Sequence, residues 1–311
     1  MVSIRVGTRG SKLALWQAEW VAGQLTQRGH EVELVTISTQ GDVSKQSLSQ
    51  VGGQGLFTKE IQRELLSGNV DVAVHSLKDL PTVPIEGLQL AAVPQRETTD
   101  DCLISRTGEA FEALPSGARV GTGSSRRGAQ LLAWRPDVEI VDIRGNVDSR
   151  LRKLEENKYE AIVLAAAGLT RLKLLSRISQ VLPSERILPA IGQGALGIEC
   201  RSRDTDLQAA LSALNDASSF AAVTAERALL ASLLAGCLAP VAALGQVDAA
   251  GMLTLRARVC AHDGSRMLEA TGRGPAGNAQ ALGTNVAEQL RSQGATELIE
   301  QARRQIAGDA S

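Results

Sequence analysis

Apolar and polar positions alternate along the first part of the chain as short strands followed by longer helices. Residues 4–6 predict a strand, and the apolar residues after it recur near helical spacing, with Ser11 placed to cap the first turn. Two further strands are predicted at residues 32–38 and 70–74, with a helix at residues 57–66 between them. This order is typical of an α/β unit.

A second α/β series begins after the polar stretch of residues 96–101. Strands are predicted at residues 119–121, 138–143 and 161–165, and the segments between them predict helices rich in leucine and arginine. Strands that alternate with helices form largely parallel or mixed sheets. The similar order of elements suggests that the two series share one topology.

The last third of the chain has a different pattern. The predicted elements are one long alanine-rich helix, a group of strands and two closing helices, at residues 217–234, 241–247, 253–260, 267–272, 278–292 and 295–307. A chain of 311 residues is too long for one ordinary hydrophobic core. We therefore expect two or three domains, the last of which differs in architecture from the α/β units.

Composition narrows the classes of partner. The chain carries 43% hydrophobic and 22% charged residues, which is normal for a globular protein, and its formal net charge is −1. That balance lacks the basic excess of a DNA-binding domain, and aromatic residues, at 2%, offer few platforms for stacking on bases. We expect a small-molecule partner and no nucleic acid.

The N-terminus and the cysteines favour the cytoplasm. The first residues lack the apolar segment of a signal peptide, and no stretch reaches the roughly 18 apolar residues of a membrane span, so no membrane contact is expected. The four cysteines, Cys102, Cys200, Cys237 and Cys260, form no CxxC pair and indicate neither a disulfide framework nor a metal site. Nothing in the sequence demands more than a monomer.

A predicted apolar strand near residue 74 runs directly into polar residues that can do chemistry. His75, Ser76, Lys78 and Asp79 follow it within five positions. Side chains at the carboxyl end of a strand are well placed to line a ligand cleft. The alternative is that Lys78 and Asp79 form a plain surface ion pair.

Arginines recur near the strand ends of the second series. Ser124, Arg126 and Arg127 follow a small-residue turn that opens a helix, where backbone N–H groups and guanidiniums suit carboxylates or phosphates. Positive charge there opposes the helix dipole and a bound anion would compensate it, whereas the alternative is a helix start with solvated arginines. Three more arginines occupy similar positions, namely Arg144, Arg150 and Arg171. Together they predict a cleft for a polycarboxylate.

Two glycine-containing segments complete the candidate set. Residues 189–200 are glycine-rich before a short apolar strand and are typical of a crossing between domains. Residues 236–240 lie just past the end of the long predicted helix and place Cys237 in a turn. On residue chemistry alone, Cys237 is most simply a buried apolar thiol.

These segments together resemble the porphobilinogen deaminase (hydroxymethylbilane synthase) family, in order over nearly the whole chain. The resembling stretches are residues 7–18, 51–60, 75–81, 121–127, 143–147, 189–200 and 236–240. The resemblance implies two α/β domains like the lobes of periplasmic binding proteins around a cleft, and a smaller C-terminal α+β domain with a short antiparallel sheet. The expected first, second and third domains are residues 1–94 with 195–212, residues 100–190 and residues 217–311.

The resemblance also implies an activity and a cofactor. Members of the family are transferases of porphyrin and heme biosynthesis that join four porphobilinogen molecules head to tail, release ammonia and form hydroxymethylbilane. The growing polypyrrole chain is built on a covalent dipyrromethane primer, whose thioether attachment maps to Cys237. The catalytic aspartate maps to Asp79, whose carboxylate would assist loss of ammonia and stabilise positive charge on the pyrrole nitrogens.

Further residues match the family's binding positions. Those that hold the cofactor, besides the attachment cysteine, are Lys78, Ser124, Arg126, Arg127 and Arg150. Those that contact substrate are Arg9, Ser11, Phe57, Ser76, Arg144, Arg171 and Gln193. The chain departs from the family pattern at three positions, since Gln54 replaces a common lysine, Lys12 a frequent proline and Gly123 a common serine.

Two other functions stay open at this point. A two-lobed, arginine-lined cleft also suits a non-catalytic module that captures an anionic metabolite, although such a module has no use for a cysteine on a third domain. The segment 121–127 also suits an enzyme that handles phosphate, although the sequence lacks a Walker lysine and a clear cluster of metal-binding carboxylates.

Overall fold

The first sheet combines the N-terminal strands with one strand that returns from much later in the chain. The computed structural model describes residues 3–39, 58–235 and 239–308. The sheet has the order β2-β1-β3-β10-β4, in which the first three strands are parallel and β10 is antiparallel to both of its neighbours. The strands are β1 (Ile4–Thr8), β2 (Val32–Thr36), β3 (Val72–Ser76), β4 (Leu88–Ala92) and β10 (Leu196–Arg201).

Helices cover both faces of this first sheet. Val72 and Val74 of β3 pack in one layer with the apolar side of α1, and Ala73 between them packs in the opposite layer with α3, as the alternation of a strand requires. Ser11 caps α1, because its Oγ accepts a hydrogen bond from the backbone N–H of Ala14 at 3.3 Å. The helices are α1 (Lys12–Thr26), α3 (Lys59–Leu66) and α7 (Thr205–Ser212).

The second sheet repeats the same arrangement. Its order is β7-β6-β8-β5-β9, so three parallel strands in the order second, first, third are again followed by an antiparallel strand, here β5. The strands are β5 (Asp101–Ser105), β6 (Arg119–Gly121), β7 (Glu139–Val141), β8 (Ala161–Ala165) and β9 (Gln180–Leu182). The helices are α4 (Ser125–Trp134), α5 (Val147–Glu155) and α6 (Ala166–Arg171).

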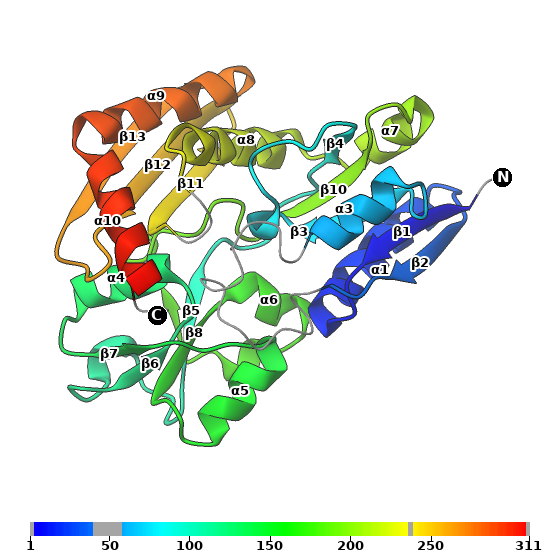
Figure 1. The fold of residues 1–311 in the computed structure, drawn as a ribbon. Helices are drawn as coiled ribbons and strands as arrows, with labels where there is room; N and C mark the ends of the chain where they lie inside the picture. Colours follow the sequence, from blue (N-terminus) through cyan, green and yellow to red (C-terminus); the bar gives the residue numbers. More distant parts are fainter. Residues whose placement is uncertain (1–2, 40–57, 236–238, 309–311) are drawn as a thin grey trace.

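The third sheet is antiparallel and has the order β11-β12-β13. Leu229 of α8 and Val286 of α9 share a core with Leu255 at the centre of the sheet. The elements are α8 (Ala217–Ser232), β11 (Val241–Val247), β12 (Met252–Cys260), β13 (Met267–Pro275), α9 (Ala279–Ser292) and α10 (Ala295–Gly308). Figure 1 shows this unit above the second sheet and beside the first, with α8 reaching toward the first sheet.

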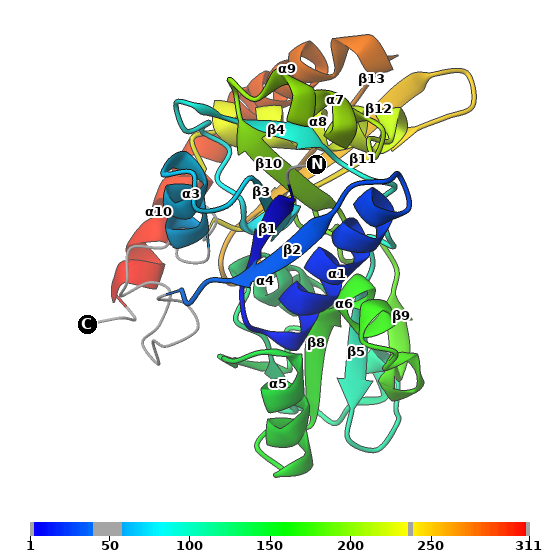
Figure 2. The ribbon, with the colours of Figure 1, turned by 90° about the vertical axis from the view of Figure 1, so that its right-hand side faces the viewer.

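Two crossings join the α/β units, one between β4 and β5 and the other between β9 and β10. Figure 2, turned by 90°, shows the first unit above the second with α1 close to α6 where the units meet. The predicted fold class, two α/β units with mixed sheets and a small antiparallel α+β unit, is therefore confirmed.

Most predicted elements exist with small shifts in their ends. The strand predicted at residues 70–74 is β3, which begins and ends two residues later, and three strands were not predicted, namely β4, β5 and β9. The stretch 96–101 is not a connecting segment over its whole length. Its last residue, Asp101, is fully buried and begins β5. Within residues 3–39, 58–235 and 239–308, we find no helix of sufficient length and apolarity to span a bilayer.

Candidate functional site

The segment after β3 forms a short turn that carries the first two candidate residues. Leu77–Asp79 is a single 3-10 turn whose first residue is buried and whose Lys78 and Asp79 side chains are partly exposed. The turn is held to the second crossing, because the Leu77 N–H donates to the Ala195 carbonyl at 3.0 Å. Gly192 lies beneath it with φ +71°, and a Cβ there would approach the Lys78 nitrogen to 3.2 Å. Only glycine allows this close approach without displacement.

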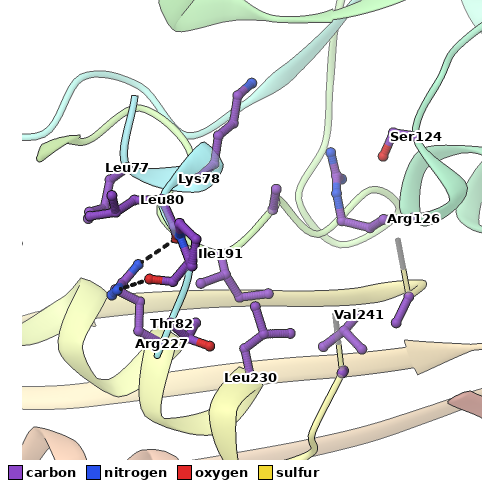
Figure 3. Close-up of a pocket in the computed structure, with 14 residues that line it drawn as sticks. Leu77, Lys78, Leu80, Thr82, Ser124, Arg126, Ile191, Arg227, Leu230 and Val241 are labelled. Carbon is purple, nitrogen blue, oxygen red and sulfur yellow. Dashed lines mark hydrogen bonds between the residues drawn. The ribbon is translucent and has the colours of Figure 1, made fainter. Parts of the chain in front are cut away.

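A pocket opens beside this turn, where all three units meet. Figure 3 shows Lys78 and Leu80 on one side, Ser124 and Arg126 on another, and the α8 residues Arg227 and Leu230 below. The remaining lining residues are Leu77, Pro81, Thr82, Ala190, Ile191, Ala235, Ala239 and Val241. The lining therefore combines apolar side chains with three cationic residues, Lys78, Arg126 and Arg227.

The two arginines that open α4 share one buried carboxylate. Arg126 Nη1 donates to Asp101 Oδ2 at 2.8 Å, and Arg127 donates to Asp101 Oδ1 through Nε at 3.0 Å and Nη2 at 2.7 Å. The side chain of Asp101 is 0% exposed, and those of Arg126 and Arg127 are 5% and 7% exposed. The alternative of solvated arginines is therefore wrong, and Asp101 supplies the compensating negative charge that was expected from a bound anion.

The charge balance of this cluster leaves the site positive. One carboxylate, that of Asp101, pairs with two guanidiniums, and the positive charges of both arginines disfavour the charged form of the neighbouring Lys78. Burial and the positive charge of Arg127 together lower the pKa of the Lys78 ammonium to about 8, against the opposing effect of Asp79. An anionic group in the pocket would relieve this repulsion.

The expected alternative for Lys78 and Asp79, a plain surface ion pair, does not form. Among the residues that the structure describes, neither side chain has an ion pair or a hydrogen bond. Asp79 instead acts at longer range on Lys78 and on Arg150 of the second unit, because its negative charge favours the charged form of both. The carboxylate therefore lies among cations with its oxygens available to a ligand.

The loop and helix after β7 carry two further predicted arginines, of which Arg150 interacts with the charge of Asp79. Arg144 Nε donates to Asp142 at 2.8 Å, and Arg150 Nε donates to the Gly145 carbonyl at 2.8 Å, so both keep further N–H groups for a ligand. Burial, together with the positive charges of Arg127 and Arg144, lowers the pKa of Arg150 to about 10. Asn146 caps α5 and so fixes the start of the helix that carries Arg150.

The remaining predicted residues lie farther from this centre. Arg171 is 8% exposed, donates to the Gly194 carbonyl at 2.7 Å and lies 5.8 Å from the ring centroid of Trp16. Ser76 exchanges hydrogen bonds with Gln17, and Ser11 caps α1. Arg9 lies just after β1, at the carboxyl edge of the first sheet.

Gln193, which is predicted to contact substrate, lies in the second crossing and does not line the pocket. Its side chain is fully buried, and its Nε2 donates to the Thr99 carbonyl at 2.7 Å and to Asp101 Oδ1 at 2.9 Å. These bonds join the two crossings to each other. Gln193 therefore links the second crossing to the first and to the buried carboxylate of Asp101.

Three predicted positions lie outside the described residues, namely Cys237, Phe57 and the departure at Gln54. The residues flanking segment 236–238, Ala235 and Ala239, both line the pocket. The departure at Lys12 makes an ion pair of 2.8 Å with Asp148, which joins α1 of the first unit to α5 of the second. Gly123 lies close to the loop after β7, and a Cβ there would approach the Ile143 carbonyl oxygen to 3.0 Å.

Two residues that organise the site were not predicted from the sequence. Asp101 stands at the end of the polar stretch 96–101. The only sign in the sequence that it is buried is the apolar run Cys102–Ile104 that directly follows it. Arg227 belongs to the long helix α8, where its position suggests nothing beyond helical periodicity. Both act on groups that are distant in the sequence.

Comparison with known proteins gives two family matches that together cover most of the chain. The model described as "Porphobilinogen deaminase, dipyromethane cofactor binding domain" matches residues 4–209, and "Porphobilinogen deaminase, C-terminal domain" matches residues 220–292. The porphobilinogen deaminase of Geobacter metallireducens is 49% identical over 95% of this chain and 93% of its own length. That of Syntrophotalea carbinolica is 48% identical over 96% of this chain and 95% of its own length.

Among solved structures, the similarity covers about 70% of the chain. An arginine-specific periplasmic binding protein of Salmonella typhimurium aligns with a TM-score of 0.41 and 14% identity, over 71% of this chain and 94% of its own. An ancestral arginine-binding protein bound to arginine aligns with a TM-score of 0.37 and 18% identity, over 68% of this chain and 90% of its own.

Proposed function

This chain belongs to the porphobilinogen deaminase family, and we propose that Asp79, Cys237 and the cationic pocket between the three units carry out its reaction. The protein is a transferase of porphyrin biosynthesis that joins four porphobilinogen molecules head to tail, releases ammonia and yields hydroxymethylbilane on a dipyrromethane primer.

Cys237 is proposed as the attachment point of the primer. The other three cysteines are buried, and burial raises the pKa of Cys102 and Cys260 to about 12, which leaves these thiols unreactive. The residues on both sides of segment 236–238 line the pocket beside Lys78 and Arg126. The chemistry of the pocket suits the primer. The primer's carboxylates need cationic partners, and its rings can pack on the apolar side chains of the lining, such as Ile191, Leu230 and Val241.

Asp79 is proposed as the catalytic carboxylate. Bound to the protein, the primer would supply the pyrrole carbon for the first new bond, and the terminal ring of the growing chain would supply it for each later bond. The partly exposed Asp79 has no hydrogen-bond partner among the described residues, so its oxygens can accept pyrrole N–H groups and hold a proton as ammonia leaves. Its negative charge would stabilise positive charge that develops on the pyrrole rings.

The remaining polar residues are proposed to hold carboxylates. We assign Lys78, Ser124, Arg126, Arg127 and Arg150 to the primer. Substrate units, which each bring an acetate and a propionate, are assigned to Arg9, Ser11, Ser76, Arg144 and Arg171, with Phe57 as a neighbouring aromatic. The neighbouring positive charges that lower the pKa of Lys78 and Arg150 support this assignment, because anionic ligands would reverse that effect.

The domain division and the cellular setting are also proposals. We propose domains of residues 1–94 with 195–212, 100–190 and 217–311, which the three separate sheets and their cores support. We further propose a cytoplasmic monomer, which agrees with free, buried thiols at Cys102, Cys200 and Cys260.

Intact mass of the native protein tests the primer assignment. We expect extra mass equal to two linked pyrroles, lost in Cys237→Ser and kept in Cys260→Ser, which removes a buried thiol instead. A simple anion-binding module would carry no covalent dipyrrole. Unmodified protein with full activity would contradict the assignment of Cys237.

Titration of Lys78 tests whether this residue meets the primer. In Cys237→Ser, which lacks the primer, the Lys78 amine is expected to become reactive near pH 8. In the primer-bearing protein, neighbouring carboxylates should raise this pKa, so labelling at pH 8 to 9 should fall. Competitive amine labelling read by mass spectrometry measures it, with the exposed Lys59 as reference. Equal titration in both proteins would remove Lys78 from the primer site.

The lowered pKa of Lys78 makes the stability of the primer-free protein depend on pH. Because the pKa of Lys78 in the folded protein lies below its usual value of 10.5, the unfolded chain binds more protons between pH 8 and 10.5. The contribution of Lys78 to the free energy of unfolding therefore rises with pH across that window in the primer-free protein.

A further inference from the structure

Arg227 of α8 bonds to the two residues that directly follow Asp79. Its Nη1 donates to the Leu80 carbonyl at 2.9 Å and its Nη2 donates to the Pro81 carbonyl at 2.6 Å. Figure 3 shows both bonds, with the guanidinium beneath the turn and the Lys78 side chain directed away from it. A planar guanidinium that holds two consecutive carbonyls fixes both the position and the direction of the chain.

The same face of α8 also packs against the turn. Phe220, Val223 and Arg227 are spaced three and four residues apart and so lie on one side of the helix. Val223 shares a buried cluster with Leu77 and Leu80, and Phe220 packs against that cluster. The helix therefore supplies an apolar surface under the turn and one bidentate polar anchor at its end.

The anchor acts where the turn has few other constraints. The start of the turn is held by the bond from Leu77 to Ala195, and the Leu80 N–H closes the turn on the Leu77 carbonyl at 3.1 Å. Pro81 has no N–H to donate. The hydrogen bonds that the structure shows for the Leu80 and Pro81 carbonyls are those from Arg227.

We propose that Arg227 is a positioning residue that sets the place of Asp79 beside the pocket, an inference that rests on the catalytic role proposed for Asp79. The helix that carries Arg227 ends at Ser232, and Ala235 and Ala239 beyond it line the same pocket. Helix α8 therefore connects the turn that carries Asp79 to the part of the pocket that Ala235 and Ala239 line. Displacement of a catalytic group by about 1 Å costs as much as 100-fold in rate.

The test compares Arg227→Met and Arg227→Lys with a matched control. Arg135 also holds carbonyls around a 3-10 turn, since it donates to those of Phe111, Glu112 and Leu114, but that turn carries no site residue. In primer-bearing protein, Arg227→Met is expected to lower kcat about 10- to 100-fold with less than a threefold change in KM for porphobilinogen. Arg227→Lys should recover part of kcat, and Arg135→Met should keep kcat within about twofold.

Amide hydrogen exchange gives a second readout. Exchange of residues 77–82 should quicken in Arg227→Met and stay unchanged in Arg135→Met, because only the first variant releases the turn. If Arg227→Met does not fold, Arg227→Lys decides, since it keeps the charge but loses the bidentate contact. A kcat that is retained, or a KM that rises while kcat stays constant, would overturn the proposal. The latter pattern would indicate direct contact with a substrate carboxylate.

The outcome can be separated from that of the proposed function. If Asp79→Asn keeps the wild-type kcat, the assignment of Asp79 fails whatever Arg227 does. If Asp79→Asn is inactive and Arg227→Met is fully active, the assignment of Asp79 stands and the positioning role of Arg227 is refuted.

Discussion

Replacement Asp79→Asn is expected to lower kcat by about 100- to 10,000-fold while the protein stays folded and carries its primer. Asparagine has nearly the same shape as aspartate but cannot take up a proton or carry negative charge. The folded state should tolerate it, because Asp79 is partly exposed and has no hydrogen bond or ion pair among the described residues. Steady-state kinetics and intact mass on one preparation measure both effects.

The matched control for this variant is Asp142→Asn. Asp142 also lies close enough to Arg150 to raise its pKa, and its carboxylate is about half exposed and pairs with Arg144 at 2.8 Å. This control removes one negative charge from the same cleft without altering the turn that carries Asp79. A similar loss of kcat in both variants would show that only the overall charge of the cleft matters, and would remove the catalytic role of Asp79.

Local features of the sequence predicted the elements that bear the site. Ser11, Ser124 and Asn146 were each followed by a helix, and all three accept a capping hydrogen bond from the backbone. The strand that leads to Asp79 was predicted from its apolar run, although its ends were shifted by two residues. These features depend on neighbours within a few positions, which a pattern along the chain can report.

The partners of the site residues depend instead on how distant elements meet. Arg126 and Arg127 were identified as cations at a helix start, but Asp101, 25 and 26 residues earlier, was not recognised as their counterion. Gln193 lies in a segment correctly predicted as a crossing, but the hydrogen bonds of its amide group to Thr99 of the other crossing and to Asp101 were not predicted. The bond from Arg227 to Leu80 spans 147 residues. Such pairings follow from the packing of whole units and leave no periodic signal.

Asp101→Asn is expected to lower the free energy of unfolding by about 3–5 kcal/mol, because it leaves two buried guanidiniums without their counterion. Asp101 also accepts a hydrogen bond from Gln193 at 2.9 Å, so the variant loosens the joint between the two crossings. Urea unfolding at pH 7 measures the change. The arginines should also lose their fixed orientation, so KM for porphobilinogen is expected to rise.

The effect of Asp101 on stability should disappear in acid. Burial alone would raise its pKa, but the charges and hydrogen bonds of Arg126 and Arg127 outweigh burial and hold the pKa well below its usual value of 3.8. A carboxyl with a depressed pKa in the folded state stabilises the protein above the unfolded value and loses that contribution as pH falls below it. The difference between wild type and Asp101→Asn should therefore be constant above about pH 5 and shrink below pH 4.

Asp71→Asn provides the comparison that separates burial from mere pairing. Asp71 also lies between two arginines, Arg5 and Arg201, each 2.9 Å from its Oδ1, but its side chain is 17% exposed where that of Asp101 is 0%. Water can solvate the groups left behind at Asp71, so its replacement should cost clearly less stability and leave KM unchanged. Equal losses at both positions would mean that burial of Asp101 adds nothing, and that the arginine pair of the site does not depend on a desolvated counterion.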